Sequence, residues 1–235
     1  MQRRLSAFKD YTIEAPDGNV GHISDILFED DNWNLRWFVV NTGSWLFGRR
    51  LLLHPTTLGK PDIRQGAFPV MRTRAEIEAS PDLSSDLPVS GQMKQNLDVN
   101  YAYGSIWDDG FYNSYNFGLS NGGMSTTSSS RQDGMMQAGD PRLRSINQVF
   151  GYSIHALDGD IGHLDDFLVD DETWKIEYAV VDTKNWGSGK HVLVPATEIK
   201  SFDWGERDVR IDRTRYSIKS APSWQEPDWS DHHTG

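Results

Sequence analysis

The chain repeats itself at a spacing of 141 residues, and this repeat limits the possible folds more than any other feature of the sequence. Residues 17–45 align with residues 158–186 without a gap. Twelve of the 29 aligned positions are identical, and in the first copy these are Asp17, Gly18, Gly21, His22, Asp25, Leu27, Asp30, Trp33, Val39, Val40, Thr42 and Trp45. Because self-similarity at a fixed spacing is the signature of duplicated units, we expect two copies of one small fold.

The similarity extends beyond this block, so that each copy spans about 80 residues. Tyr11 aligns with Tyr152 on the N-terminal side. On the C-terminal side we predict a slip of one residue that brings Pro55 onto Pro195. The spacing of 141 then returns, with Thr73 matching Thr214.

Each copy is typical of short β-strands joined by tight turns. The runs YTIEA and YSIHA end at an Asp-Gly pair, which predicts a two-residue hairpin loop centred on that pair. The runs LRWFVVNT and IEYAVVDT are rich in the β-branched and aromatic residues that favour strands. Thr73 with Glu76 three residues later predicts a capping box at the start of a short closing helix.

We therefore predict a mainly all-β protein with two small antiparallel β-barrels, each closed by a short helix. The barrels are assigned to residues 1–82 and 141–222, and residues 223–235 to a polar tail. Residues 83–140 form the linker between them, which is aromatic at first and then rich in Gly and Ser. Its seven aromatic residues lie within residues 101–117, and this stretch is expected either to pack on a barrel or to bind a partner.

Composition excludes several classes of function. The chain has no cysteine, which excludes disulfides, thiolate metal sites and cysteine nucleophiles. Its net charge of −11 disfavours nucleic acid as a partner, because phosphates attract a Lys/Arg-rich surface. No run approaches the roughly 18 apolar residues of a membrane span, and the first residues do not resemble a secretory signal. We expect a cytoplasmic location, no membrane span and no cofactor.

Two His-x-x-Asp pairs, His22 with Asp25 and His163 with Asp166, are the candidates for a metal site. Residues three apart in a strand point to opposite faces, so neither pair is suited to chelate a metal there. The sequence therefore disfavours metal binding. The aspartates are instead expected to end strands and to turn the chain.

The tryptophans that recur in both copies have two interpretations. The favoured one is that a large aromatic side chain closes each end of a small barrel. The other is that they are exposed contacts for a protein partner, together with the basic residues of the neighbouring loops. The candidate protein-binding residues are Trp33, Trp45, Arg49, Arg50, Trp174, Trp186 and Lys190.

The pattern D-G-x-[VI]-G-H-[IL]-x-D-x-L-x-x-D-x-x-W, followed by a Thr-x-x-Trp motif and a hydrophobic stretch that closes on proline, resembles the PRC-barrel domain. The resemblance covers both copies. In this respect the chain is similar to the cytoplasmic domain of the photosynthetic reaction centre H subunit and to the C-terminal domain of RimM-type ribosome maturation factors. The resemblance implies a small β-barrel used for docking in the assembly of larger complexes, without catalytic machinery.

These observations together predict a non-enzymatic module that binds protein partners through loops at the ends of its barrels. The alternative is a sensor or carrier that holds a small ligand or a metal in a cleft between the barrels. No G-x-S-x-G elbow or phosphate-binding loop of the P-loop spacing is present, which disfavours an enzyme. The duplication also leaves a homo-oligomer possible, since two similar domains can imitate a two-fold dimer within one chain.

Overall fold

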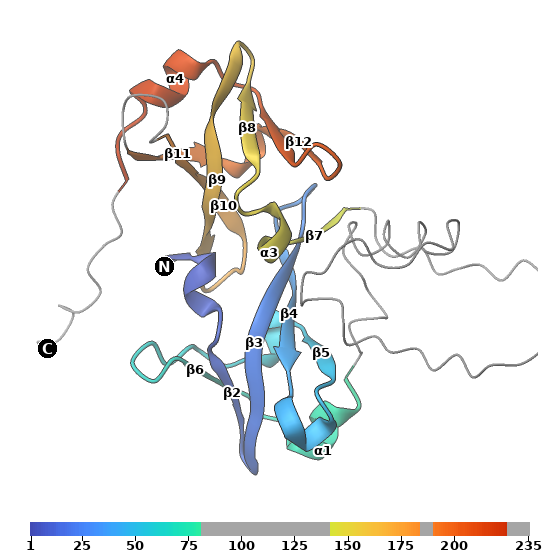
Figure 1. The fold of residues 1–235 in the computed structure, drawn as a ribbon. Coiled ribbons are helices and arrows are strands. Elements are labelled where there is room, and N and C mark those ends of the chain that lie inside the picture. The colour runs from blue at the N-terminus through green and yellow to red at the C-terminus, as the bar shows by residue number, and fades with distance from the viewer. Residues whose placement is uncertain (81–141, 184–189, 225–235) are drawn as a thin grey trace, which may run out of the picture.

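The computed structural model of the chain describes residues 1–80, 142–183 and 190–224. These residues form two mainly β domains with short helices, which residues 81–141 separate in the sequence (Figure 1). We call residues 1–80 the N-terminal domain, and the described residues from 142 to 224 the C-terminal domain. The predicted fold class is confirmed. Within the described residues, no helix is long and apolar enough to cross a membrane.

The two domains contain similar elements in the same order. The strands of the N-terminal domain are β1 (Gln2–Arg4), β2 (Thr12–Ala15), β3 (Gly18–Glu29), β4 (Leu35–Asn41), β5 (Arg50–Leu53) and β6 (Ala67–Pro69). Its helices are η1 (Leu5–Phe8), η2 (Gly43–Leu46), η3 (Pro55–Thr57) and α1 (Arg74–Glu78). The strands of the C-terminal domain are β7 (Leu143–Ser145), β8 (Ser153–Ala156), β9 (Gly159–Asp170), β10 (Ile176–Asp182), β11 (His191–Pro195), β12 (Ile199–Asp203) and β13 (Asp208–Ile211). Its helices are α3 (Ile146–Val149), η6 (Ala196–Glu198) and α4 (Arg215–Ser220).

Strand pairing follows the 141-residue spacing throughout, which corrects the predicted slip at Pro55. Phe38 pairs with Leu53 in the N-terminal domain, and Ala179 pairs with Val194 in the C-terminal domain. Both pairs are related by a shift of 141, so His54 is equivalent to Pro195. The predicted slip was wrong because strand register, and not the shared proline, decides which residues are equivalent. The alternation of buried and exposed side chains sets that register.

The sheets are antiparallel except for one pair in each domain. The order is β5-β4-β3-β2-β6 in the N-terminal domain and β11-β10-β9-β8-β13-β12 in the C-terminal domain. The pairs β2–β6 and β8–β13 are parallel. The predicted antiparallel arrangement therefore does not extend to these two pairs. Each of them joins an early strand, β2 or β8, to a strand that comes late in the same domain.

The predicted hairpins are present, but their loops lie one residue earlier than the Asp-Gly pairs. Ala15 pairs with Gly18, so Pro16 and Asp17 form the loop, and Gly18 takes a positive φ of 136° where the next strand begins. The carboxylate of Asp17 is used elsewhere, because its Oδ1 accepts from the backbone N of Arg74 at 2.9 Å. The C-terminal domain repeats this contact with Asp158 and Arg215. The aspartate therefore serves to tie the closing helix to the hairpin.

The two domains exchange their first strands. The short strand β1 pairs with β9 of the C-terminal domain, and β7 pairs with β3 of the N-terminal domain. Figure 1 shows the long strands β3 and β9 extending in opposite directions from the middle of the molecule, where the N-terminus and β7 also lie. Since equivalent strands are exchanged in both directions, the halves are related as in a two-fold dimer.

Two tryptophans join the hydrophobic cores of the domains. Trp174 packs against Phe8, Phe38 and Phe68 of the N-terminal domain, with ring centroids 5.3–5.9 Å apart. Trp33 packs in the same way near Phe167 and Phe202 of the C-terminal domain. Buried residues of both domains form one continuous cluster. A domain of about 80 residues buries little core by itself, so this shared core stabilises both halves.

Candidate protein-binding site

The tryptophans at the domain junction are structural. Trp33 is only 5% exposed, and both Trp33 and Trp174 take the left-handed conformation, with φ of 65° and 57°. Their carbonyl oxygens accept from the backbone of the other domain, at 2.8 Å from Ile176 and 2.9 Å from Leu35. The hypothesis that Trp33 is an exposed partner contact is corrected, because its partner is the other half of the same chain. Trp174 is half-buried in the equivalent place.

The predicted metal candidates are not brought together. Asp25 is fully buried, and its carboxylate accepts from the Ser145 hydroxyl at 2.6 Å, from Ile26 N at 2.8 Å and from Asn147 N at 3.3 Å. His22 lies opposite Asn41 in the ladder of β3 and β4, and is half-buried. Across the described ranges, no group of three or more His, Asp or Glu side chains could hold a metal ion.

The same carboxylate position recurs in the C-terminal domain. Asp166 accepts from the backbone N of Ser6 at 3.1 Å, from the Ser6 hydroxyl, and from Phe167 N at 2.8 Å, while His163 nearby is exposed. Burial raises the pKa of Asp25 to about 6 and also raises the pKa of Asp166, because the charged form loses its hydration. Each carboxylate thus binds the exchanged N-terminal segment of the other domain.

The loop after β4 and the first residue of β5 carry three of the predicted contact residues, Trp45, Arg49 and Arg50, at one end of the N-terminal domain. The Trp45 indole N donates to the carbonyl O of Val20, and the guanidinium of Arg74 lies 4.3 Å from the centre of its ring. Trp45 is therefore half-buried and fixed, whereas Arg49 is exposed and Arg50 begins β5. The structure adds Phe47, which is 97% exposed. The sequence carried a signal for this exposure: the equivalent residue of the second copy is Ser188, so the fold does not require an aromatic side chain at this position.

Of the corresponding residues in the C-terminal domain, Lys190 has a structural contact and Trp186 lies outside the described residues. The Lys190 ammonium donates to the carbonyl O of Ala221 at 2.8 Å. This contact holds the segment after α4 along β11, where Trp224 N also donates to His191 O at 2.8 Å. The Arg4 guanidinium lies 5.0 Å from the Trp224 ring, so this predicted tail residue is packed on the domain.

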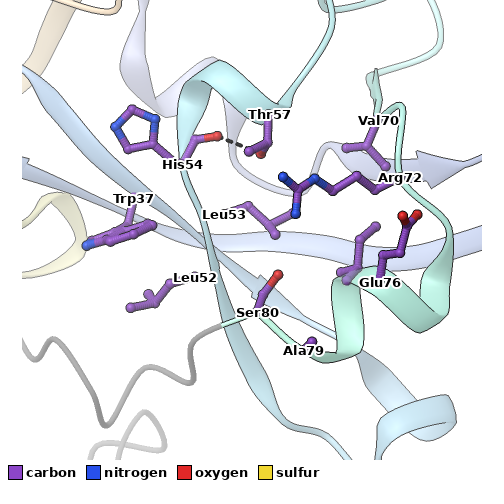
Figure 2. Close-up of a pocket in the computed structure, with 11 residues that line it drawn as sticks. Trp37, Leu52, Leu53, His54, Thr57, Val70, Arg72, Glu76, Ala79 and Ser80 are labelled. Carbon is purple, nitrogen blue, oxygen red and sulfur yellow. Dashed lines mark hydrogen bonds between the residues drawn. The ribbon is translucent and has the colours of Figure 1, made fainter.

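A pocket of about 230 Å³ lies on the N-terminal domain beside α1, and no sequence feature had indicated it. Figure 2 shows Arg72 extending toward Leu53 and Thr57, with Trp37 and His54 on the other side. The pocket is lined by Trp37, Leu52, Leu53, His54, Thr57, Val70, Arg72, Glu76, Ile77, Ala79 and Ser80. An apolar floor with charged and aromatic groups at the rim is the usual composition of a binding pocket.

Ring contacts hold Trp37 in place on the aromatic side of the pocket. The rings of Trp37 and His54 meet edge to face with centroids 5.7 Å apart, and the Arg36 guanidinium lies 6.0 Å from the centre of the Trp37 ring. Arg36 also pairs with Glu29 at 2.5 Å. Burial, and then the charge of Arg36, lower the pKa of His54, although the charge of Glu29 acts in the opposite direction.

The charge balance of the pocket differs from that of the equivalent place in the C-terminal domain. There Arg213 donates to Glu198 at 2.9 Å. The residues equivalent to this pair are Arg72 and Thr57, so the N-terminal domain keeps the arginine and lacks the carboxylate. Within the described residues, Arg72 makes no ion pair, since Glu76 on the same rim instead bonds the backbone and hydroxyl of Thr73.

Comparison with known proteins assigns a family to one of the two domains. Residues 142–216 match the PRC-barrel domain family. No curated protein matches the chain. The matched range begins just before β7 and ends within α4, so it contains the strands β7 to β13 but not β1, which pairs with β9 from the other domain. The chain therefore contains a PRC-barrel domain at residues 142–216, beside an N-terminal domain that has the same strand register.

Proposed function

We propose that this chain is a non-enzymatic protein-binding module, and that it docks onto assembly partners through the loop at the end of its N-terminal domain. The observation that carries the proposal is Phe47, an aromatic side chain that is 97% exposed and stands between the buried Leu46 and Gly48. Its φ of 55° and the φ of 73° at Gly48 set the shape of the loop, and Arg49 follows directly. An exposed aromatic with an adjacent arginine is the composition of an interface hot spot.

The two residues before Phe47, Trp45 and Leu46, pack against the domain and fix the loop. Trp45 is bonded to Val20 and covered by Arg74, and Leu46 is 7% exposed. A fixed loop loses little conformational freedom when it binds, and burying a phenylalanine side chain contributes about 2–3 kcal/mol. The loop can therefore present Phe47 without a large entropic cost.

The alternative of a small ligand held between the domains has little support in the described residues. Aromatic rings occupy that junction, with Trp33 and Phe202 at 6.1 Å and Phe28 and Phe167 at 5.1 Å between centroids. Side chains packed at these separations fill the space that a ligand would need.

The test is affinity capture from native cells with the full chain and two variants. Phe47→Ser removes the exposed ring of the loop, and Tyr216→Ser removes a ring that is 80% exposed on the C-terminal domain. We expect one stoichiometric partner to be retained by the native chain and by Tyr216→Ser, and to be reduced at least about tenfold by Phe47→Ser. Equal retention by Phe47→Ser would contradict the proposed surface. A thermal shift with metal or a small molecule, with no partner captured, would favour the alternative.

A further inference from the structure

We propose that the pocket of Trp37, Thr57 and Arg72 binds the chain's own acidic aromatic segment, residues 101–117. This site is separate from the loop of Phe47 and does not depend on the proposed function. The segment reads YAYGSIWDDGFYNSYNF, with seven aromatic residues, two aspartates and no lysine or arginine.

The first argument is the unpaired charge at the pocket. Duplication gives both domains an arginine at this position, and the C-terminal domain neutralises its copy, Arg213, with Glu198. Thr57 replaces the glutamate in the N-terminal domain. Glu76 on the same rim feels the charge of Arg72, but its carboxylate accepts from the backbone N and the hydroxyl of Thr73, and among the described residues Arg72 forms no ion pair. The fold does not require a threonine at position 57, because the C-terminal domain has the same fold with Glu198 at the equivalent position, paired with Arg213. An arginine left in this way is suited to bind a carboxylate from elsewhere.

The second argument is the size and lining of the pocket. Leu53, Val70 and Ile77 provide an apolar floor, and Trp37 provides an aromatic wall. The volume of about 230 Å³ is below the 300–1,000 Å³ of pockets for drug-sized ligands. The pocket therefore suits a single large side chain with an acidic group beside it, rather than a whole small molecule.

The segment has the complementary chemistry. Trp107 is followed directly by Asp108 and Asp109, so an aromatic ring and two carboxylates lie within three residues. An indole placed on the apolar floor beside Trp37 would gain an aromatic contact, and a neighbouring carboxylate would reach Arg72. No lysine or arginine in residues 101–117 would oppose this charge pairing.

The third argument is the position of the chain on both sides of residues 81–141. Ser80, the last described residue before them, lines the pocket itself. Leu143, just after them, belongs to β7 and pairs with Glu29 of the N-terminal domain. Twenty residues, 81–100, lie between Ser80 and the segment, and a chain of that length spans at most about 70 Å, which is enough to return to the pocket. Contact between the segment and the pocket is then intramolecular, which favours it over contact with a separate molecule.

The C-terminal domain shows the same kind of contact in a described segment. After α4 the chain runs back along β11, where Val192 pairs with Ser223. Trp224 then packs with the Arg4 guanidinium, 5.0 Å from the centre of the ring. A segment that follows the closing helix thus places a tryptophan against an arginine of β1, the exchanged strand that pairs with β9.

The experiment is limited chymotrypsin digestion of the full chain, with cleavage measured at Tyr101 and Tyr103. Chymotrypsin cleaves after aromatic residues, and cleavage of a docked segment follows the fraction of time that it is undocked. Arg72→Glu reverses the charge at the pocket. Thr57→Glu supplies the carboxylate that the C-terminal domain has, so it pairs Arg72 within the domain. A charge-assisted contact is worth about 1.5–3 kcal/mol, so both variants should speed cleavage about tenfold or more.

Three controls make the result specific. Arg64→Glu changes the same charge on an exposed residue of the same domain outside the pocket, and cleavage should stay at the native rate. Adding Asp109→Lys to Arg72→Glu should restore slow cleavage, because the charge pair is then reversed. An unchanged urea midpoint for each variant shows that the fold is intact.

Three results would overturn the inference. The first is native cleavage at the rate of the free peptide of residues 101–117. The second is protection in Arg72→Glu and Thr57→Glu equal to that of the native chain. The third is protection that increases with protein concentration, which would place the segment in the pocket of a second copy.

Discussion

The buried carboxylate of Asp25 gives the protein a stability that depends on pH in a predictable direction. Burial raises its pKa to about 6 from an ordinary value of 3.8, although the Ser145 hydroxyl and two backbone N–H groups act in the opposite direction. In the unfolded chain the carboxyl ionises at its ordinary pKa. Between these two values the folded protein binds more protons than the unfolded chain, so the free energy of unfolding falls as pH rises.

The magnitude follows from the difference of about two pKa units. Each unit corresponds to 1.36 kcal/mol, so ionised Asp25 costs the folded protein about 2–3 kcal/mol at pH 7.5 relative to pH 4, where the carboxyl of the unfolded chain is already partly ionised. Asp25→Asn removes the charge and keeps the hydrogen bonds. Its amide oxygen can accept from Ile26 and Asn147, and its amide nitrogen can donate to the Ser145 oxygen. The variant should equal the native protein near pH 4 and exceed its stability by up to about 3 kcal/mol at pH 7.5.

The assay is urea unfolding followed by tryptophan fluorescence, for both proteins at several values between pH 4 and pH 7.5. Taking the difference between the two proteins cancels the other titrating groups, including Asp166. Asp25→Ala serves as a control, because it leaves the donors of Ser145 and Asn147 without an acceptor and should be less stable at every pH. The reasoning is refuted if the native protein is the more stable one at pH 7.5 and its advantage disappears toward pH 4. The hydrogen bonds would then outweigh burial.

Three further substitutions test the fold. Trp174→Ala should cost about 3–4 kcal/mol and lower the urea midpoint, because its ring fills the core of the other domain. Gly21→Ala should destabilise far more than Gly43→Ala: a methyl group at Gly21 would lie 2.1 Å from the carbonyl O of Asn41, whereas nothing lies within 4 Å at Gly43. The φ of 150° at Gly21 is one that side chains rarely adopt, whereas the φ of 59° at Gly43 lies in the left-handed region, so backbone strain adds to the clash at Gly21. Thr73→Ala should cost about 1 kcal/mol in thermal unfolding, because it removes the capping box of α1.

The difference between the two copies at the pocket of Arg72 can be seen only when residues 55–57 are aligned in the correct register. With the predicted slip of one residue at Pro55, Thr57 is opposite Thr197, and the two copies look alike there. The strand pairing restores the spacing of 141 and places Thr57 opposite Glu198. The absence of a carboxylate at position 57 follows from that register, and so does the lack of an ion pair at Arg72 within the described residues. The difference was present in the sequence, but only strand register decided which residues to compare.

The tryptophans illustrate a different limit of the sequence. Recurrence of Trp33 and Trp174 at a turn correctly indicated a structural role for a large aromatic residue. It did not indicate whose core each one fills. That choice depends on the exchange of β1 and β7, and short strands of three residues carry too little pattern to predict their partners.

The sequence by itself determined the duplication, the mainly β class, the capping box of α1 and the absence of cysteine chemistry, because these depend on local composition and on a repeat that needs no partner to be seen. Only the tertiary structure decided that the two domains share one core, that Asp25 and Asp166 bind the exchanged strands, and that Phe47 is exposed while Trp33 is not. The physical reason is that burial is a property of the assembled surfaces. A large aromatic side chain is buried where the other half of the chain packs against it, as at Trp33, and stays exposed where nothing does, as at Phe47.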